Sequence, residues 1–227
     1  MDSSKRTMDM SSVEEIASRI DYTNLKANIS LDDVKRICKE SIDNRFAAVC
    51  IPPVFITDAV KWLEDSPVKV ATVVGFPMGY GATSAKVEGI KNAVDKEVDE
   101  VDVVMNIAAV KNARWAFARN DIEAMATTAH LNNKIIKVII EIGLLTPEEI
   151  EKVCEICVDA DVDFVKTSTG FLSRGATVED VERLRALLPR SIKIKASGGI
   201  KSKAQAEALI RAGADRIGAS AALDLIQ

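Results

Sequence analysis

The stretch VDFVKTSTG at residues 162–170 decides the fold. Its apolar half predicts a buried strand, and Lys166 stands where that strand gives way to small hydroxyl residues and a glycine. A second stretch, IKIKASGG at 192–199, has the same form and carries Lys195 at the corresponding place. The two stretches lie about one strand–helix–strand unit apart. We therefore expect parallel neighbouring strands whose backbones are about 5 Å apart.

Two amines at that separation have a chemical consequence. Two ammonium groups repel each other and burial disfavours charge further, so Lys166 or Lys195 should lose its proton near neutral pH. A neutral lysine amine is a nucleophile for carbonyl carbon. The pair therefore predicts covalent lysine chemistry.

Short apolar runs alternate with helical patterns along the chain. Eight strand-like runs lie at 19–23, 47–51, 69–74, 100–105, 135–141, 162–167, 192–196 and 216–219. Most are apolar on both faces, which is typical of a parallel sheet covered on both sides. Helix starts between them are indicated by capping-box pairs, namely Ser30 with Asp33, Thr146 with Glu149, Thr177 with Asp180 and Ser202 with Gln205.

Eight strand–helix units in 227 residues predict an α/β fold, a single (β/α)8 TIM barrel over residues 12–227. A doubly wound open sheet is the alternative, but it usually has fewer strands, and no Gly-x-Gly-x-x-Gly stands at the first turn. Residues 1–11 are polar and lack the apolar core of a secretory signal, so we expect a disordered N-terminal tail.

The composition narrows the classes of function. Thirty basic residues against thirty-four acidic ones give a net charge of −4, which argues against nucleic acid as a partner. No apolar run approaches the roughly 20 residues of a membrane span, so we expect no membrane partner. Cys154 and Cys157 fall on one apolar helix face with Ile150 and Val153, so we interpret them as packing residues rather than metal ligands. Reduced thiols suit a cytoplasmic location.

Four charged residues lie inside apolar strands, namely Asp102, Lys137, Lys166 and Lys195, and the first predicted strand adds Asp21. Charged side chains are rarely buried unless they are paired or functional. In a barrel, side chains at the carboxyl ends of the strands face the active site. We therefore expect the five to converge on the barrel mouth as a catalytic cluster. Taken singly, Asp102 could be a structural ion-pair partner and Lys137 could snorkel to solvent.

Glycines and hydroxyl residues follow the last three predicted strands. We expect them to bind a phosphate, and they are Thr169, Gly170, Gly198, Gly199, Gly218 and Ser220. Glycine lets backbone N–H groups approach an anion, and loops after the seventh and eighth strands often bind phosphate in barrels. A glycine pair alone usually marks only a turn, so its place after the seventh strand carries the argument.

The chain resembles the deoxyribose-phosphate aldolase family. The resemblance is carried by residues 21–26 (DYTNLK), 46–50, 69–77, 100–104, 137–141, 164–170 (FVKTSTG) and 195–199 (KASGG). It implies a class I aldolase, a lyase on a (β/α)8 barrel, that reversibly cleaves 2-deoxy-D-ribose 5-phosphate into acetaldehyde and D-glyceraldehyde 3-phosphate. It also implies a place in deoxyribonucleoside catabolism. Neither a metal nor another cofactor is implied, because an iminium serves as the electron sink.

The resemblance further implies roles for individual residues. Lys166 corresponds to the Schiff-base lysine, Lys195 to its neighbouring lysine and Asp102 to the proton-transfer aspartate, while Lys137 and Asp21 are lesser members. The chain departs from the family at two places. Tyr22 stands where the family usually has His, which implies altered packing behind the site. Ala221 stands where a second hydroxyl is frequent, which implies the loss of one phosphate hydrogen bond, about 1.5–3 kcal/mol if charge-assisted.

Other functions remain as alternatives. A different Schiff-base aldolase would keep Lys166 and change the substrates. A sugar-phosphate isomerase on the same barrel would use acid–base carboxylates and need no covalent amine. A sugar-phosphate sensor would bind without turnover, but the lysine and aspartate set argues against it, because binding alone needs no neutral lysine. A homodimer or higher homo-oligomer is left open, since barrel helices often pair in this fold class.

Overall fold

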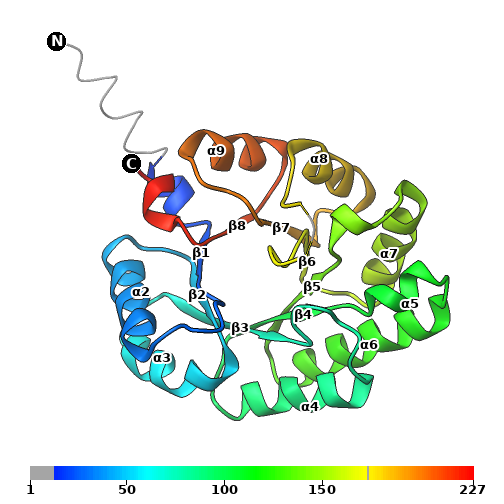
Figure 1. The fold of residues 1–227 in the computed structure, drawn as a ribbon, viewed down its shortest axis with the longest axis horizontal. Helices are drawn as coiled ribbons and strands as arrows, with labels where there is room; N and C mark the ends of the chain where they lie inside the picture. The colour runs from blue at the N-terminus through cyan, green and yellow to red at the C-terminus, as the bar shows by residue number, and fades with distance from the viewer. Residues whose placement is uncertain (1–12, 173) are drawn as a thin grey trace.

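The computed structural model describes residues 13–172 and 174–227, so the expected tail at 1–11 lies outside the described residues. Eight parallel strands form a closed barrel in sequence order, with helices around it (Figure 1). The strands are β1 (Ile20–Thr23), β2 (Ala48–Ile51), β3 (Lys69–Val74), β4 (Glu100–Val104), β5 (Ile135–Ile139), β6 (Phe164–Lys166), β7 (Lys193–Ser197) and β8 (Arg216–Ala219). Because β1 also pairs with β8, the sheet is closed. The predicted (β/α)8 barrel is confirmed, and the open sheet is excluded.

Helices cover the outside of the barrel. They are α2 (Leu31–Asp43), α3 (Ile56–Leu63), α4 (Thr83–Val94), α5 (Ile107–Lys111), α6 (Trp115–Leu131), α7 (Pro147–Asp159), α8 (Val178–Leu187) and α9 (Lys203–Ala212). The described residues also form three short 3-10 helices: η1 (Pro53–Phe55), η2 (Ile142–Leu144) and η3 (Ala222–Leu225). The four predicted capping boxes are confirmed at the starts of α2, α7, α8 and α9, where each N-cap hydroxyl accepts the N–H of the third helical residue.

The main hydrophobic core lies between the strands and the helices. Alternate strand residues such as Val103, Val138 and Ile194 face outward and are completely buried. On α7, Cys154 and Cys157 lie on the buried face, which confirms their packing role. None of the described helices is long and apolar enough to cross a membrane. Among the same residues, no cluster of three or more His, Cys, Asp or Glu side chains could hold a metal ion.

The inside of the barrel has two unlike halves. Strands β2 and β3 fill one half with small apolar side chains, namely Ala48, Cys50, Ala71 and Val73. The other strands contribute charged side chains to the other half: Asp21, Glu100, Asp102, Lys137, Lys166, Lys195 and Arg216. Barrel interiors are usually filled by branched apolar residues, so packing alone does not explain the charged half.

Two strands are shorter than expected by more than one residue. The fifth predicted strand reached residue 141, but β5 ends at Ile139 and Glu141 has a left-handed backbone with φ of 49°. At this turn the Glu141 carboxylate accepts the backbone N–H of Thr169 at 2.9 Å. The sixth strand is Phe164–Lys166 rather than 162–167. The chain therefore leaves the strand ladder directly after Lys166, where the loops that surround the mouth begin.

Candidate active site

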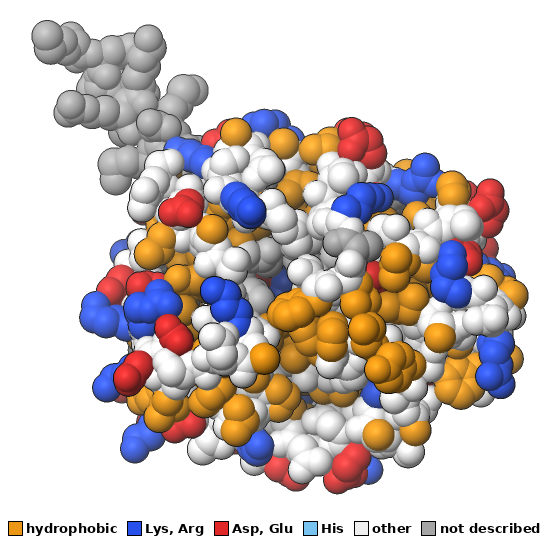
Figure 2. Space-filling model, viewed as in Figure 1, with side chains coloured by type: hydrophobic (Ala, Val, Ile, Leu, Met, Phe, Trp, Pro, Cys, Tyr) orange, Lys and Arg blue, Asp and Glu red, His pale blue; other side chains and the backbone are white. Residues whose placement is uncertain are grey.

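A cavity of about 270 Å³ lies at the carboxyl-terminal mouth of the barrel. Lys166 lines it together with all six residues predicted to bind phosphate, Thr169, Gly170, Gly198, Gly199, Gly218 and Ser220. Figure 2 shows the molecule in the view of Figure 1, with hydrophobic side chains gathered beside the hollowed centre. The loops after β6, β7 and β8 thus surround the same space that the Lys166 amine reaches.

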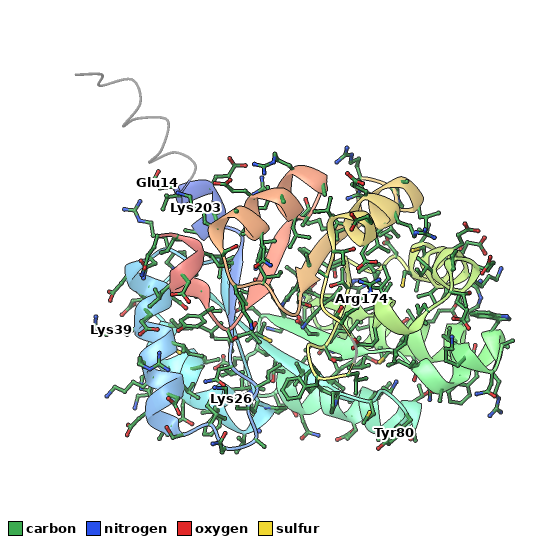
Figure 3. All side chains as sticks on the ribbon, turned by 45° about the horizontal axis from the view of Figure 1, so that its top comes forward. Glu14, Lys26, Lys39, Tyr80, Arg174 and Lys203 are labelled. Carbon is green, nitrogen blue, oxygen red and sulfur yellow. The ribbon has the colours of Figure 1, made fainter. Side chains whose placement is uncertain are left out.

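The rim of the cavity adds residues that the sequence reasoning missed. Lys26 and Lys201 are exposed lysines that line it, and Figure 3 shows Lys26 on the loop after β1. Phe171 also lines the cavity, and its ring packs edge-on against Phe76 with centroids 5.1 Å apart. Lysines on loops give no periodic signal, so only their nearness to the predicted glycines could have drawn attention to them. They place positive charge beside the glycine loops.

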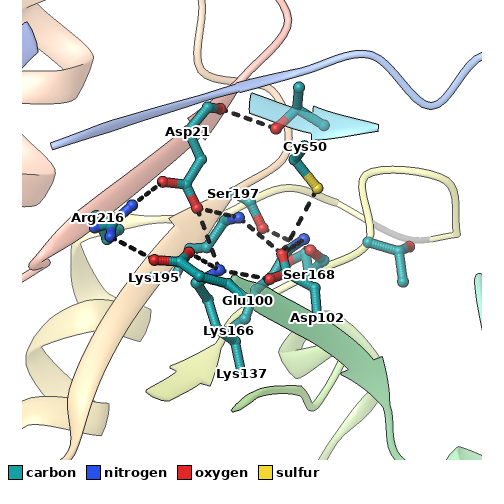
Figure 4. A network of polar contacts seen from close by, with 12 residues as sticks. Asp21, Cys50, Glu100, Asp102, Lys137, Lys166, Ser168, Lys195, Ser197 and Arg216 are labelled. Carbon is teal, nitrogen blue, oxygen red and sulfur yellow. Dashed lines mark hydrogen bonds and ion pairs between the residues drawn. The ribbon is translucent and has the colours of Figure 1, made fainter. Parts of the chain in front are cut away.

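One carboxylate binds three ammonium groups below this cavity (Figure 4). Asp102 Oδ2 accepts from Lys166 Nζ at 2.8 Å and from Lys195 Nζ at 2.7 Å. Its other oxygen, Oδ1, accepts from Lys137 Nζ at 2.7 Å. The register explains the convergence, because Lys166 lies opposite Lys195 and Asp102 opposite Lys137 on neighbouring strands. The expected pairing of the two lysine strands as parallel neighbours is confirmed.

Two further carboxylates and an arginine lie next to this cluster. Asp21 Oδ2 is 2.5 Å from Lys195 Nζ, and Glu100 Oε2 is 2.6 Å from Lys137 Nζ. Arg216 bridges the two, since its guanidinium binds Asp21 and lies 2.9 Å from Glu100 Oε1. The sequence reasoning missed Glu100 and Arg216. The sequence did contain a signal for both, because side chains two residues apart on a strand face the same side. Glu100 stands two residues before Asp102, and Arg216 stands two residues before Gly218, and both of these later positions face inward.

The structure brings all five predicted catalytic residues together, but not at the rim. Only Lys166 lines the cavity, while Asp21, Asp102, Lys137 and Lys195 lie beneath it and are completely buried. The expected convergence on the mouth is corrected, because Asp102 and Lys137 occupy the middle of β4 and β5. The snorkelling alternative for Lys137 is wrong, since its side chain is not exposed.

The two neighbouring lysines have opposite pKa shifts. Burial lowers the pKa of Lys166 from its usual 10.5, and the Lys195 ammonium lowers it further against the attraction of Asp102. Burial also acts to lower the pKa of Lys195, but the carboxylates of Asp102 and Asp21 outweigh it and the pKa is raised. Lys166 is therefore the amine that loses its proton more easily. Burial acts to raise the pKa of Asp102, but Lys137, Lys166 and Lys195 together hold it well below its usual range.

The backbone at the glycine end of the cavity requires glycine. Gly198 and Gly199 have φ of 89° and 72°, in the left-handed region that residues with a Cβ adopt only with strain. Gly175 packs so closely on them that a Cβ there would lie 1.9 Å from the Gly198 carbonyl oxygen. The turn presents its backbone directly to the cavity, an arrangement that suits an anion.

The two departures from the family pattern lie apart from the amines. Tyr22 points away from the barrel interior, where its hydroxyl donates to Glu40 Oε2 at 2.9 Å and its ring packs edge-on against Phe46. Its effect is thus on packing outside the barrel. Ala221 directly follows the cavity residue Ser220 and precedes η3.

The fold and the site define a class: an α/β-barrel protein with a buried amine of lowered pKa at the floor of a cavity that suits an anion. Comparison with known families is more specific, because the model described as "DeoC/LacD family aldolase" matches residues 7–226. The chain belongs to the DeoC/LacD family of aldolases.

Individual relatives agree along nearly the whole chain. The deoxyribose-phosphate aldolase of Aciduliprofundum boonei is 44% identical over 213 residues, covering 94% of this chain and 96% of that protein. The deoxyribose-phosphate aldolase of Mannheimia succiniciproducens is 44% identical over 214 residues, covering 94% of this chain and 95% of that protein. A tetrameric deoxyribose phosphate aldolase from Aeropyrum pernix has a similar structure, with a TM-score of 0.89 and 29% identity over 98% of this chain and 97% of that one.

Proposed function

We propose that this chain is a class I aldolase that reversibly cleaves 2-deoxy-D-ribose 5-phosphate into acetaldehyde and D-glyceraldehyde 3-phosphate. The observation that carries the proposal is the Lys166 amine, buried on Asp102 at 2.8 Å and open to a cavity whose other side is formed by glycine loops. An amine at one end and an anion site at the other fit an aldehyde that carries a phosphate. The names of the relatives support the same substrate.

Cleavage begins at the amine. The neutral Nζ of Lys166 attacks the aldehyde carbon, and the resulting carbinolamine loses water to give an iminium ion. Asp102 contacts this nitrogen and Lys195 contacts the same carboxylate oxygen, so protons can pass along a continuous line of hydrogen bonds as water forms. Lys137 and Asp21 hold the carboxylate and the second lysine in place.

The iminium ion then draws electrons from the bond between the second and third sugar carbons. That bond breaks as the hydroxyl on the third carbon loses its proton, which releases D-glyceraldehyde 3-phosphate and leaves an enamine on Lys166. Protonation of the enamine carbon restores the iminium, and water releases acetaldehyde and the free amine. Each step runs backward in synthesis. The iminium nitrogen is the electron sink, so the mechanism requires no metal or other cofactor.

The remaining parts of the proposal concern binding and context. Thr169, Gly170, Gly198, Gly199, Gly218 and Ser220 bind the phosphate. Lys26 and Lys201 add positive charge at the rim. We assign the reaction to deoxyribonucleoside catabolism in the cytoplasm, where the buried free cysteines are at home. A homo-oligomer is part of the proposal, supported by the tetrameric relative from Aeropyrum pernix.

Trapping the Schiff base tests the proposal. The protein is incubated with acetaldehyde and borohydride, and the peptides are mapped by mass spectrometry. We expect a reduced adduct on Lys166 and, in Lys166→Arg, no adduct there and at least about a thousandfold loss of turnover with an unchanged circular dichroism spectrum. The control is Lys193→Arg, because Lys193 is exposed and lies on the neighbouring strand. This variant should keep both the adduct on Lys166 and the turnover.

Other outcomes of the same experiment would contradict the proposal. An adduct on Lys195 or Lys137 instead would keep the aldolase class and move the covalent role. Folded protein that forms no specific adduct would favour an isomerase or a sensor, and near-normal turnover of Lys166→Arg would refute the role of Lys166.

A further inference from the structure

The charges inside the barrel do not balance. In the described part of the chain, three carboxylates, of Asp21, Glu100 and Asp102, are paired with four bases, Lys137, Lys166, Lys195 and Arg216. If all were ionised, one positive charge would have no partner. All but Arg216 have side chains at most 2% exposed, and an uncompensated charge at such depth is strongly disfavoured. The array is therefore neutral when one base has lost its proton.

The ion pairs of each base indicate which one has lost its proton. Lys137 Nζ lies within ion-pair distance of all three carboxylates, at 2.6, 2.7 and 3.6 Å. Lys195 pairs with Asp21 and Asp102, and Arg216 pairs with Asp21 and Glu100. Lys166 pairs with Asp102 alone, through an oxygen that Lys195 shares. Lys166 is thus the least compensated base.

We propose that Arg216 and Glu100 are positioning residues that set the protonation of Lys166 from the floor of the barrel, one by adding a positive charge to the array and the other by adding a negative one. Neither lines the cavity, and they stand at the first positions of β8 and β4. Phe164 lies beside them, with its ring centroid 5.9 Å from the Arg216 guanidinium carbon. Their influence on the reacting amine is electrostatic. The inference rests on the proposed Schiff-base role of Lys166.

The other strands leave little to compete with this effect. On β4, Asp102 contacts Lys166 directly, and on β7, Lys195 shares the same carboxylate oxygen. On β2, the sulfur of Cys50 lies 4.0 Å from Asp102 Oδ2. Burial raises the pKa of the Cys50 thiol, so it stays neutral. Strand β3 contributes the uncharged Ala71 and Val73 to the same interior half as Cys50. Lys137, Asp21 and Glu141, whose carboxylate accepts the Thr169 N–H, complete the charged neighbours, and they are the same in every variant below.

The proposal makes opposite predictions for two substitutions. Arg216→Gln removes a positive charge, so Lys166 retains its proton to higher pH, and the acid limb of the pH profile moves up by about one pH unit. Glu100→Gln removes a negative charge, so Lys166 loses its proton more easily, and the acid limb moves down by a similar amount. The double variant restores the charge balance and should return the limb to its original position.

The experiment follows Lys166 directly. Wild type, both single variants, the double variant and the charge-conserving Arg216→Lys are incubated with acetaldehyde and cyanoborohydride at pH values from about 5 to about 9. The rate of adduct formation on Lys166 is measured by peptide mass spectrometry and compared with the pH profile of kcat/KM. We expect opposite shifts in the single variants, restoration in the double variant and a profile close to wild type for Arg216→Lys.

Several results would overturn the inference. Shifts in the same direction, or lower rates with unmoved profiles, would mean that the two residues only support the fold. A double variant that fails to restore the profile would exclude charge balance as the cause. A wild-type protein that forms no adduct on Lys166 would overturn the proposed function and this inference with it, whereas an adduct with unshifted variants would overturn the inference alone.

Discussion

At the scale of single residues, Gly175 shapes the anion end of the cavity without lining it. An added Cβ would lie 1.9 Å from the carbonyl oxygen of Gly198 and 3.0 Å from the nitrogen of Gly199. Backbone atoms cannot yield as a flexible side chain does, so the turn itself must move. The glycine N–H groups then lose the alignment that the proposed phosphate site requires.

Gly175→Ala should therefore raise KM for 2-deoxyribose 5-phosphate by about tenfold, as expected for one weakened hydrogen bond to a charged group, and should change kcat little. Steady-state kinetics with phosphorylated and unphosphorylated 2-deoxyribose measure this. Gly81→Ala is the matched control, because nothing lies within 4 Å of its added Cβ. An equal rise in KM for both sugars would mean that the substitution does not act through the phosphate group.

The site residues show what sequence reasoning can reach. Lys166 and Lys195 were predictable, because each ends an apolar run and is followed by glycine. Their common partner Asp102 was also predictable, as a charge inside an apolar strand. Glu100 and Arg216 were missed because a charge at the first position of a strand usually faces solvent. Only the closure of the barrel brings these two side chains together.

At the scale of elements, a buried ion pair ties α4 to α6 and to the end of β4. Lys86 Nζ donates to Asp121 Oδ2 at 2.7 Å and to the carbonyl of Val104 at 2.9 Å, and the two side chains are at most 1% exposed. Asp121 also accepts the backbone N–H of Asn106. The pair thus fixes two outer helices on a strand that carries Asp102.

Removing one partner should be costly. Lys86→Met leaves Asp121 buried without its cation, and we expect the free energy of unfolding to fall by about 3–5 kcal/mol. The double variant Lys86→Met/Asp121→Leu should recover most of this loss. Urea unfolding at neutral pH measures the loss, with Lys39→Met as the control, because the Lys39–Asp43 pair is exposed and contributes little to stability. If Lys86→Met cost no more than that control, the pair would not hold the helices.

The helices also show which features can be predicted from neighbouring residues in the sequence and which cannot. The starts of α2, α7, α8 and α9 were predictable, because a capping box is complete within four residues. The Lys86–Asp121 pair was not predictable, since its members lie on different helices and the sequence gives no sign of their partner. The early end of β5 depends likewise on a contact between Glu141 and the distant Thr169.

At the scale of the whole molecule, the ionised interior makes the stability of the fold depend on pH in the acid range. The pKa values of Asp21 and Asp102 in the folded protein lie below the usual 3.8, because the surrounding cations outweigh the effect of burial. As pH falls through this region, the unfolded chain binds protons that the folded chain does not. The stabilisation is therefore present above pH 3.8 and is lost as the pH falls below it.

We expect the urea midpoint to decrease steeply on the acid side. Asp102→Asn should be less stable than wild type near neutral pH and should show a shallower decrease, because one of the groups responsible is missing. Unfolding curves between about pH 6 and about pH 3 compare the two slopes. Parallel slopes would show that surface carboxylates, rather than the interior, govern the acid response.

Closure of the barrel also bears on how the protein is made. Asp21 lies on the first strand and Arg216, which binds it, on the last, 195 positions later. A ribosome that has delivered seven strands has delivered every lysine of the array but not the arginine that neutralises Asp21 and Glu100 at the floor. Such a chain lacks the strand that pairs with both β7 and β1, and its charge array is incomplete. Closure of the barrel and completion of its charge array therefore both depend on β8, the last strand in the sequence.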